Sequence, residues 1–164
     1  MLSDTLIKHI FRDNGILPSV YVFKDPYLFE IDLIDGFFQT MKYLSPNVRK
    51  FDRLVDFIKS DQYNNILSSD FGIMSSRDKK SLMIEFHKKF KTNYIAEINK
   101  RILRADYFDQ TEIKDMTTDS IIVLCSEQKI KDYITTLNKN YHIRITRYEV
   151  ILSKLISYRT IMVI

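Results

Sequence analysis

Residues 120–148 read SIIVLCSEQKIKDYITTLNKNYHIRITRY, and this stretch decides the fold class. Its first six residues are apolar or β-branched for the most part, which is typical of a buried strand. Ser126 is a suitable N-cap for the next segment, in which apolar residues recur at helical spacing. Residues 141–148 then alternate between apolar and polar side chains, as a half-buried strand does. With a final strand at Thr160–Ile164, the C-terminal third is predicted to form a β-α-β unit with an added strand.

The chain before residue 120 is predicted to be mainly helical. Two strands, Ser19–Phe23 and Leu28–Ile34, flank the turn-forming Lys24-Asp25-Pro26 and predict a β-hairpin. Residues 61–75 are rich in Asn, Ser and Asp and predict a loop. Apolar residues recur at helical spacing in five further segments, namely 6–11, 37–44, 46–58, 82–90 and 94–102.

These patterns predict an α+β protein, with a mainly helical N-terminal two thirds that carries a hairpin and a C-terminal β-α-β lobe. Residues 105–119 separate the two parts and carry five acids against one Lys. We therefore expect a helical lobe at 1–104, an acidic connector at 105–119 and a β-α-β lobe at 120–164. A single continuous domain of 164 residues is the alternative, since this length suits one domain.

The composition excludes several classes of protein. Cys125 is the only cysteine, so an intramolecular disulfide and a disulfide-rich secreted scaffold are excluded. Neither a signal peptide nor a transmembrane helix is expected, because no basic segment precedes an apolar run and no run reaches about 18 apolar residues. We expect a cytoplasmic protein, or a virion component. Abundant Ile, Lys and Asn with scarce Gly, Pro and Trp are typical of AT-rich genomes and favour a virus, phage or mobile element.

Positive charge is concentrated in residues 77–104, which carry nine Lys and Arg against three Asp and Glu. On the helix that ends near residue 102, Tyr94, Ile95, Ile98 and Ile102 are predicted to face inward, so the basic residues face solvent. Exposed Lys, Arg and Asn side chains are the types that contact phosphates and base edges. The predicted nucleic-acid-binding residues are Lys88, Lys89, Lys91, Asn93, Lys100, Arg101 and Arg104.

Three interpretations of this basic segment stay open. Two adjoining helices, the second with outward Asn and Arg, match the outline of a helix-turn-helix. However, the turn lacks its usual small residue, and phosphate would repel Glu97. The same face would also suit an acidic protein partner, or would be an ordinary solvated surface.

Acidic residues supply a second candidate site. Five carboxylates, which either bind a divalent cation or pair with the basic helices, lie between the two lobes: Asp106, Asp109, Glu112, Asp115 and Asp119. Asp119 with Glu127, Gln128 and Lys129 is similar to the carboxylates and lysine of a metal-dependent nuclease. Against this, Asp119 precedes the strand 121–125 and lies about 20 Å from its far end.

No catalytic residue, metal ligand or cofactor is assigned from the sequence. His9, His87 and His142 stand alone, Cys125 is expected to be buried, and no hydrolase, phosphate-loop or dinucleotide-binding motif occurs. The sequence favours a non-catalytic binding protein that contacts nucleic acid or a nucleoprotein assembly. The alternatives are a structural or assembly subunit, whose terminal strand pairs with a partner sheet, and a small metal-dependent nuclease.

Overall fold

The computed structural model describes residues 5, 9, 13, 26–74, 76–151 and 155–163. The predicted strand Ser19–Phe23, and with it the hairpin, lies outside the described residues, as does most of the predicted helix at 6–11. The described part mixes helices with an antiparallel sheet, so the α+β class is confirmed. Among the described residues, no helix combines the length and the apolar character needed to cross a bilayer.

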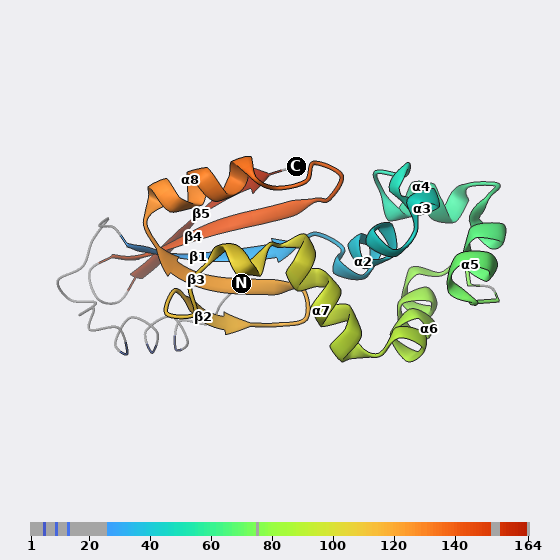
Figure 1. Ribbon diagram of the computed structural model, residues 1–164, viewed down its shortest axis with the longest axis horizontal. Coiled ribbons are helices and arrows are strands. Elements are labelled where there is room, and N and C mark those ends of the chain that lie inside the picture. Colours follow the sequence, from blue (N-terminus) through green and yellow to red (C-terminus); the bar gives the residue numbers. More distant parts are fainter. Residues whose placement is uncertain are drawn as a thin grey trace.

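The five-stranded sheet has the order β2-β3-β1-β4-β5, and every neighbouring pair is antiparallel (Figure 1). Its strands are β1 (Tyr27–Leu33), β2 (Ile113–Met116), β3 (Ser120–Cys125), β4 (Ile143–Ile151) and β5 (Leu155–Val163). Because β1 pairs with both β3 and β4, these two strands run in the same direction on either side of it. Helix α8 (Glu127–Thr135) connects them, so the predicted β-α-β unit is present with β1 inserted between its strands.

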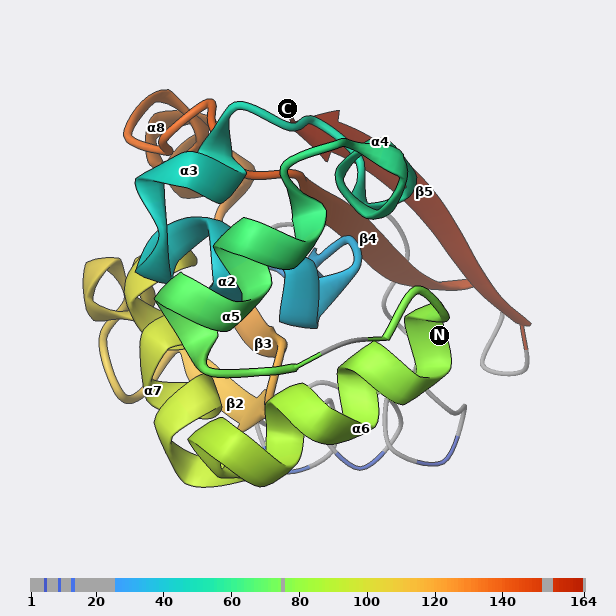
Figure 2. The same ribbon diagram turned by 90° about the vertical axis from the view of Figure 1, so that its right-hand side faces the viewer.

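Most of the remaining helices gather beyond one end of the sheet (Figures 1 and 2). They are α2 (Gly36–Leu44), α3 (Pro46–Arg49), α4 (Leu54–Lys59), α5 (Tyr63–Phe71) and α6 (Lys79–Phe90). Helix α7 (Thr92–Ile102) then leads back to the sheet, followed by the 3-10 turn η1 (Ala105–Tyr107). Ile95 belongs to the apolar cluster of the helical part, whereas Ile98 and Ile102 belong to that of the sheet. Helix α7 is therefore anchored in both cores.

Two local predictions were wrong. The helix predicted at 46–58 begins at Pro46 as expected, but it is interrupted after Arg49 and resumes as α4 at Leu54. The hydroxyl of the buried Ser45, at the N-cap position, bonds to Asp70. The predicted loop at 61–75 contains α5, which buries Tyr63, Ile66, Leu67 and Phe71 at helical spacing. Gly72 ends α5 in the left-handed conformation, with φ 66°.

The sheet crosses the predicted lobe boundary. Strand β1 comes from the predicted helical lobe and pairs with β3 and β4 from the C-terminal lobe. The acidic connector forms η1 and the end strand β2, and the division into domains stays a prediction. Of the final strand expected at Thr160–Ile164, residues 160–163 belong to β5, the other end strand of the described sheet. Its use for pairing with a partner also stays a prediction.

Candidate nucleic-acid interface

The basic segment folds into α6 and α7, which meet at a sharp corner. Asp78 caps α6, since its carboxylate accepts a hydrogen bond from the Ser81 amide at 3.1 Å. Only Lys91 separates the two helices, and its φ of 49° is uncommon for a residue with a side chain. A helix-turn-helix has a turn of three or four residues, so this corner does not match that motif.

The inner face of α7 is held by a buried polar contact as well as by apolar packing. Asn99 is 1% exposed, and its side-chain oxygen accepts a hydrogen bond from the Thr40 hydroxyl at 2.6 Å. Its side-chain nitrogen donates to the Thr118 carbonyl at 3.0 Å. Asn99 thereby links α2, α7 and the turn between β2 and β3. The predicted inward position of Tyr94 was wrong, because this side chain is 45% exposed.

We call the outer side of α7, together with the α6–α7 corner, the α7 face. It consists of Lys88, Lys91, Asn93, Tyr94, Glu97, Lys100 and Arg101, all of them exposed. Within the described part of the chain, the side chains of Lys88, Lys91 and Lys100 form neither an ion pair nor a hydrogen bond. Arg101 pairs with Glu97 at 3.3 Å, with both side chains more than half exposed, so this contact is weak.

Lys89 and Arg104, which were also predicted as site residues, have close neighbours within the protein. The Lys89 ammonium lies against Gly72 at the C-terminal end of α5, where helix carbonyls attract a cation. Arg104 follows the end of α7, is half-buried, and donates a hydrogen bond to the Thr136 carbonyl at 3.5 Å. Both remain close to the α7 face. The hydrogen bond partly engages Arg104, whereas the side chain of Lys89 forms no hydrogen bond or ion pair among the described residues.

A shallow hollow of about 510 Å³ lies at the C-terminal end of α7. Its charged lining consists of Lys100, Arg101 and Arg104 with the acids Glu97 and Asp106. The corner lysines stand at the opposite end of the helix, roughly 15 Å away at about 1.5 Å per residue. The structure therefore divides the predicted cations into two groups at the two ends of one exposed helical face.

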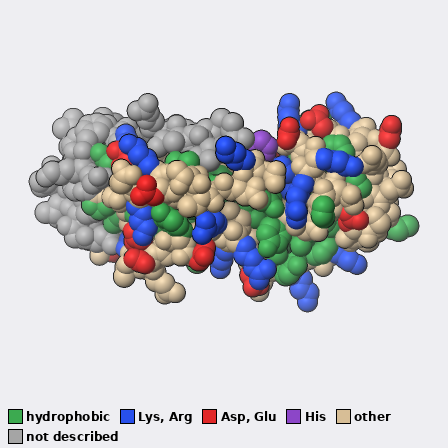
Figure 3. All heavy atoms as spheres, turned by 45° about the horizontal axis from the view of Figure 1, so that its top comes forward, with side chains coloured by type: hydrophobic (Ala, Val, Ile, Leu, Met, Phe, Trp, Pro, Cys, Tyr) green, Lys and Arg blue, Asp and Glu red, His purple; other side chains and the backbone are tan. Residues whose placement is uncertain are grey.

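Surface charge alone does not single out this face. Figure 3 shows a side of the molecule on which Lys and Arg lie among Asp and Glu over both the sheet and the helical part. Cations without a carboxylate partner among the described residues also occur elsewhere, for example at Lys59, Lys80, Lys131 and Lys139. What separates the α7 face is that it lies in residues 77–104, where nine Lys and Arg stand against three Asp and Glu.

The residues grouped as a nuclease-like set lie at different ends of the sheet. Asp119 directly precedes β3, whereas Glu127 and Lys129 follow its other end, in the first turn of α8. Lys129 is paired with Glu112, and Glu127 with Arg147 at 3.0 Å. Burial opposes the ionisation of Glu112, but hydrogen bonds from Lys129 and from the Asp109 amide hold its pKa below the ordinary value. This end of the sheet therefore contains compensated ion pairs.

Asp119 instead shares a hollow of about 480 Å³ with Asp32 and Asp35, neither of which was among the residues predicted from the sequence. The antiparallel register brings them together, because Asp32 lies opposite Ser120 and the Leu33 amide donates to the Asp119 carbonyl at 2.9 Å. Lys79, His87 and Arg144 line the same hollow. The sequence shows Asp32 near the end of one predicted strand and Asp119 just before a later one. It does not show that these two strands pair, and the pairing is what makes the two residues neighbours.

Two of these three carboxylates are already neutralised by nearby cations. Arg144 contacts both oxygens of Asp32, at 2.9 and 3.2 Å, and Lys79 contacts Asp35 at 2.7 Å. In the part of the chain that the structure describes, no group of three His, Cys, Asp or Glu side chains is placed to hold a metal ion. A divalent cation at this hollow would therefore need a rearrangement of these pairs.

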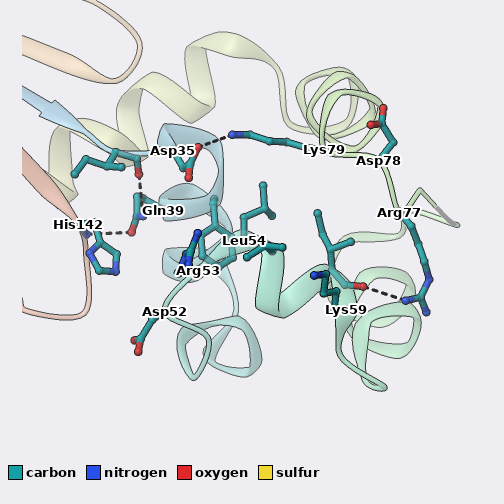
Figure 4. Close-up of a pocket in the computed structure, with 14 residues that line it drawn as sticks. Asp35, Gln39, Asp52, Arg53, Leu54, Lys59, Arg77, Asp78, Lys79 and His142 are labelled. Carbon is teal, nitrogen blue, oxygen red and sulfur yellow. Dashed lines mark hydrogen bonds and ion pairs between the residues drawn. The ribbon is translucent and has the colours of Figure 1, made fainter.

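A third hollow, of about 630 Å³, adjoins the hollow of Asp32, Asp35 and Asp119 across the Asp35–Lys79 pair (Figure 4). Its charged lining mixes Arg53, Lys59, Arg77 and Lys79 with Asp35, Asp52 and Asp78. The Arg77 guanidinium donates to the Ile58 carbonyl at 3.0 Å, and Gln39 receives a hydrogen bond from the His142 amide at 3.3 Å. Much of this lining is thus already engaged in holding α4, α6 and the sheet together.

No protein-family model, curated protein or solved structure matches this chain.

Proposed function

We propose that the protein binds nucleic acid through the α7 face. The observation that supports this is the excess of Lys and Arg in residues 77–104, within which Lys88, Lys91 and Lys100 are exposed and lack a carboxylate partner among the described residues. Neighbouring cations without counter-charges repel one another and create a positive potential. A phosphate backbone relieves this repulsion and releases its own counterions on binding.

The geometry of α7 suits such a contact. Because its inner face is fixed in both cores and by Asn99, the outer side chains project from a rigid element. The hollow beside Lys100, Arg101 and Arg104 offers three cations around one space, where a phosphate group would contact more than one of them. The corner lysines then meet the backbone further along. Glu97 and Asp106 oppose binding at this hollow, and the charge of Glu97 is offset by Arg101.

Fluorescence anisotropy tests the proposal directly. Labelled single- and double-stranded DNA and RNA are titrated with the protein at about 50 mM salt, where phosphate contacts are strong. Binding of at least one of these is expected, and no binding of any would refute the proposal. The double variant Lys88→Gln, Lys91→Gln should weaken binding. Its matched control is Lys131→Gln, Lys139→Gln, which removes the same charge from exposed positions remote from α7 in the sequence.

A metal-dependent phosphoryl-transfer enzyme is the second candidate. The observation that favours it is the shared hollow of Asp32, Asp35 and Asp119. Substrate phosphates would compete with Asp32 and Asp35 for Arg144 and Lys79, and the freed carboxylates would then hold the metal ion that the chemistry requires.

A nucleic-acid cleavage assay with Mg²⁺ or Mn²⁺ decides this second candidate. Activity is expected to fall in Asp119→Asn and to persist in the control Asp115→Asn, which changes an exposed acid outside both that hollow and the one beside α7. Absence of any metal-dependent cleavage by the wild-type protein would remove this candidate.

A further inference from the structure

We infer that the α7 face takes single-stranded nucleic acid and that the ring of Tyr94 is a platform on which one base stacks. This inference rests on the proposed function and specifies its substrate class. It starts from an exposed aromatic side chain, since Tyr94 is 45% exposed although the periodicity of the helix predicts it inside.

The ring of Tyr94 packs on an aromatic ring that is itself in contact with the core. It lies nearly parallel to the ring of Phe90, with centroids 6.2 Å apart and planes inclined by 22°. Phe90 in turn packs on buried Phe86 and Phe71, with centroid distances of 4.8 and 5.9 Å. This series of rings fixes the orientation of Tyr94 without covering it. A base that stacks on the free side would meet a surface that is already ordered and loses little entropy on binding.

Cationic and hydrogen-bonding side chains surround this platform on the same face. Lys91 and Asn93 stand just before Tyr94, and Arg101 is seven residues later, two helical turns along the same side. The distance along the axis from Tyr94 to Arg101 is roughly 10 Å. An aromatic ring between phosphate-binding side chains is the arrangement by which proteins hold a flexible strand, with bases on rings and backbone on cations.

The surroundings of α7 argue against a duplex. A helix that reads the major groove must enter it, and the groove is only about 12 Å wide. Helix α7 is packed against both α2 and α6, and the one-residue corner places α6 directly beside its N-terminal end. In a duplex the faces of the bases are also covered by their neighbours in the stack, so Tyr94 would have no base to contact. A single strand has exposed base faces and bends around such a corner.

Binding of a short single-stranded oligonucleotide and of a hairpin duplex, measured by anisotropy at fixed salt, tests this inference. The wild-type protein should prefer the single strand. Tyr94→Ala should weaken single-strand binding by about 5- to 100-fold, the range for loss of one stacked base. Tyr94→Phe should retain most of the affinity, because it keeps the ring. Ile84→Ala, which removes a similarly exposed apolar side chain from α6, should bind like the wild type.

The outcomes separate the inference from the proposed function. If the wild-type protein binds nucleic acid but Tyr94→Ala binds equally well, or if the duplex is preferred, the stacking inference is wrong and the proposed function stands. If no nucleic acid binds, the proposed function fails and the inference fails with it. Tyr94 is exposed, so the variants should fold, and circular dichroism checks this before binding is measured.

Discussion

The two faces of α7 differ in how their polar groups are satisfied. On the inner face, Asn99 is buried and both ends of its amide are hydrogen-bonded. On the outer face, Asn93 and Lys100 are exposed and have no side-chain partner among the described residues. The inner face thus uses its polar groups to hold the fold, whereas the outer face keeps them available. We therefore expect substitutions on the inner face to change stability and substitutions on the outer face to change binding.

Charge reversal on the outer face should give the largest effect. The double variant Lys100→Glu, Arg101→Glu is expected to reduce nucleic-acid affinity on the order of 100-fold at about 0.1 M salt, because it removes two phosphate contacts. The thermal midpoint should barely change, since both side chains are exposed. The control Lys131→Glu, Lys139→Glu has the same net charge and should weaken binding far less. Equal effects in the two variants would mean that net charge, and not the α7 face, governs binding.

A substitution on the inner face should act on stability alone. Asn99→Ala leaves the Thr118 carbonyl without its donor and should lower the free energy of unfolding by about 2 kcal/mol. Urea denaturation measures this, and the folded variant should bind nucleic acid like the wild type. Asn93→Ala is the matched control on the opposite face and should be nearly neutral for stability. If Asn99→Ala were no more destabilising than Asn93→Ala, the contrast between the faces would be wrong.

Lys129, which is paired with Glu112, provides a contrast to the unpaired lysines of the α7 face. Lys129 and Glu112 are mostly buried partners, so Lys129→Met should cost about 1 kcal/mol near neutral pH without changing nucleic-acid affinity. The folded-state pKa of Glu112 lies below its ordinary value of 4.5. Its contribution is therefore present above the pKa of the unfolded chain and is lost as the pH falls through the folded-state pKa.

Urea denaturation across this acid range measures that loss. The stability difference between wild type and Lys129→Met should shrink as the pH falls from about 5 to about 3. A difference that stayed constant over this range would show that Lys129 acts through packing and not through the ion pair.

The smallest effect is expected at Glu97. Glu97→Gln removes a carboxylate that phosphate repels and releases Arg101 from its weak pair. Nucleic-acid affinity should rise a few-fold, and thermal denaturation should show no measurable change. A fall in affinity would indicate that Glu97 positions Arg101 for binding.

The parts of the fold that local patterns determine were predictable. Strand β3, helix α8 and strand β4 follow from the alternation and helical spacing in residues 120–148. Ser126 caps α8 as predicted, since its hydroxyl accepts a hydrogen bond from the Lys129 amide at 3.2 Å. The insertion of β1 between β3 and β4 was not predictable, because alternation shows which face a strand buries but not which strand lies beside it.

Helix α5 was missed because its polar residues resemble those of a loop. In the structure the hydroxyls of Ser68 and Ser69 bond to the carbonyls of Asn64 and Asn65, four residues earlier, at 2.8 and 2.6 Å. The two serine hydroxyls therefore find their hydrogen-bond acceptors within the helix itself. The apolar side of the helix packs into the core through Tyr63, Ile66, Leu67 and Phe71. The hydrophobic spacing was present in the sequence, but the composition of the intervening residues concealed it.

The candidate site was predictable in outline but not in detail. The basic segment and most of its exposed side chains follow from the sequence. The exposure of Tyr94 and the burial of Asn99 do not, because hydrophobicity alone favours a buried Tyr and an exposed Asn. The structure reverses this order because Thr40 and Thr118, distant in sequence, supply the partners that allow Asn99 to be buried.

The salt dependence of single-strand affinity tests the central claim most directly. Between about 50 and 200 mM salt, the logarithm of the association constant should fall linearly with the logarithm of the salt concentration. In Lys100→Glu, Arg101→Glu this slope should be shallower by about 0.7 for each phosphate that the variant no longer neutralises, whereas Tyr94→Ala should keep the wild-type slope. Affinity that does not depend on salt, or a charge-reversal variant with an unchanged slope, would contradict the assignment of the α7 face as the binding surface.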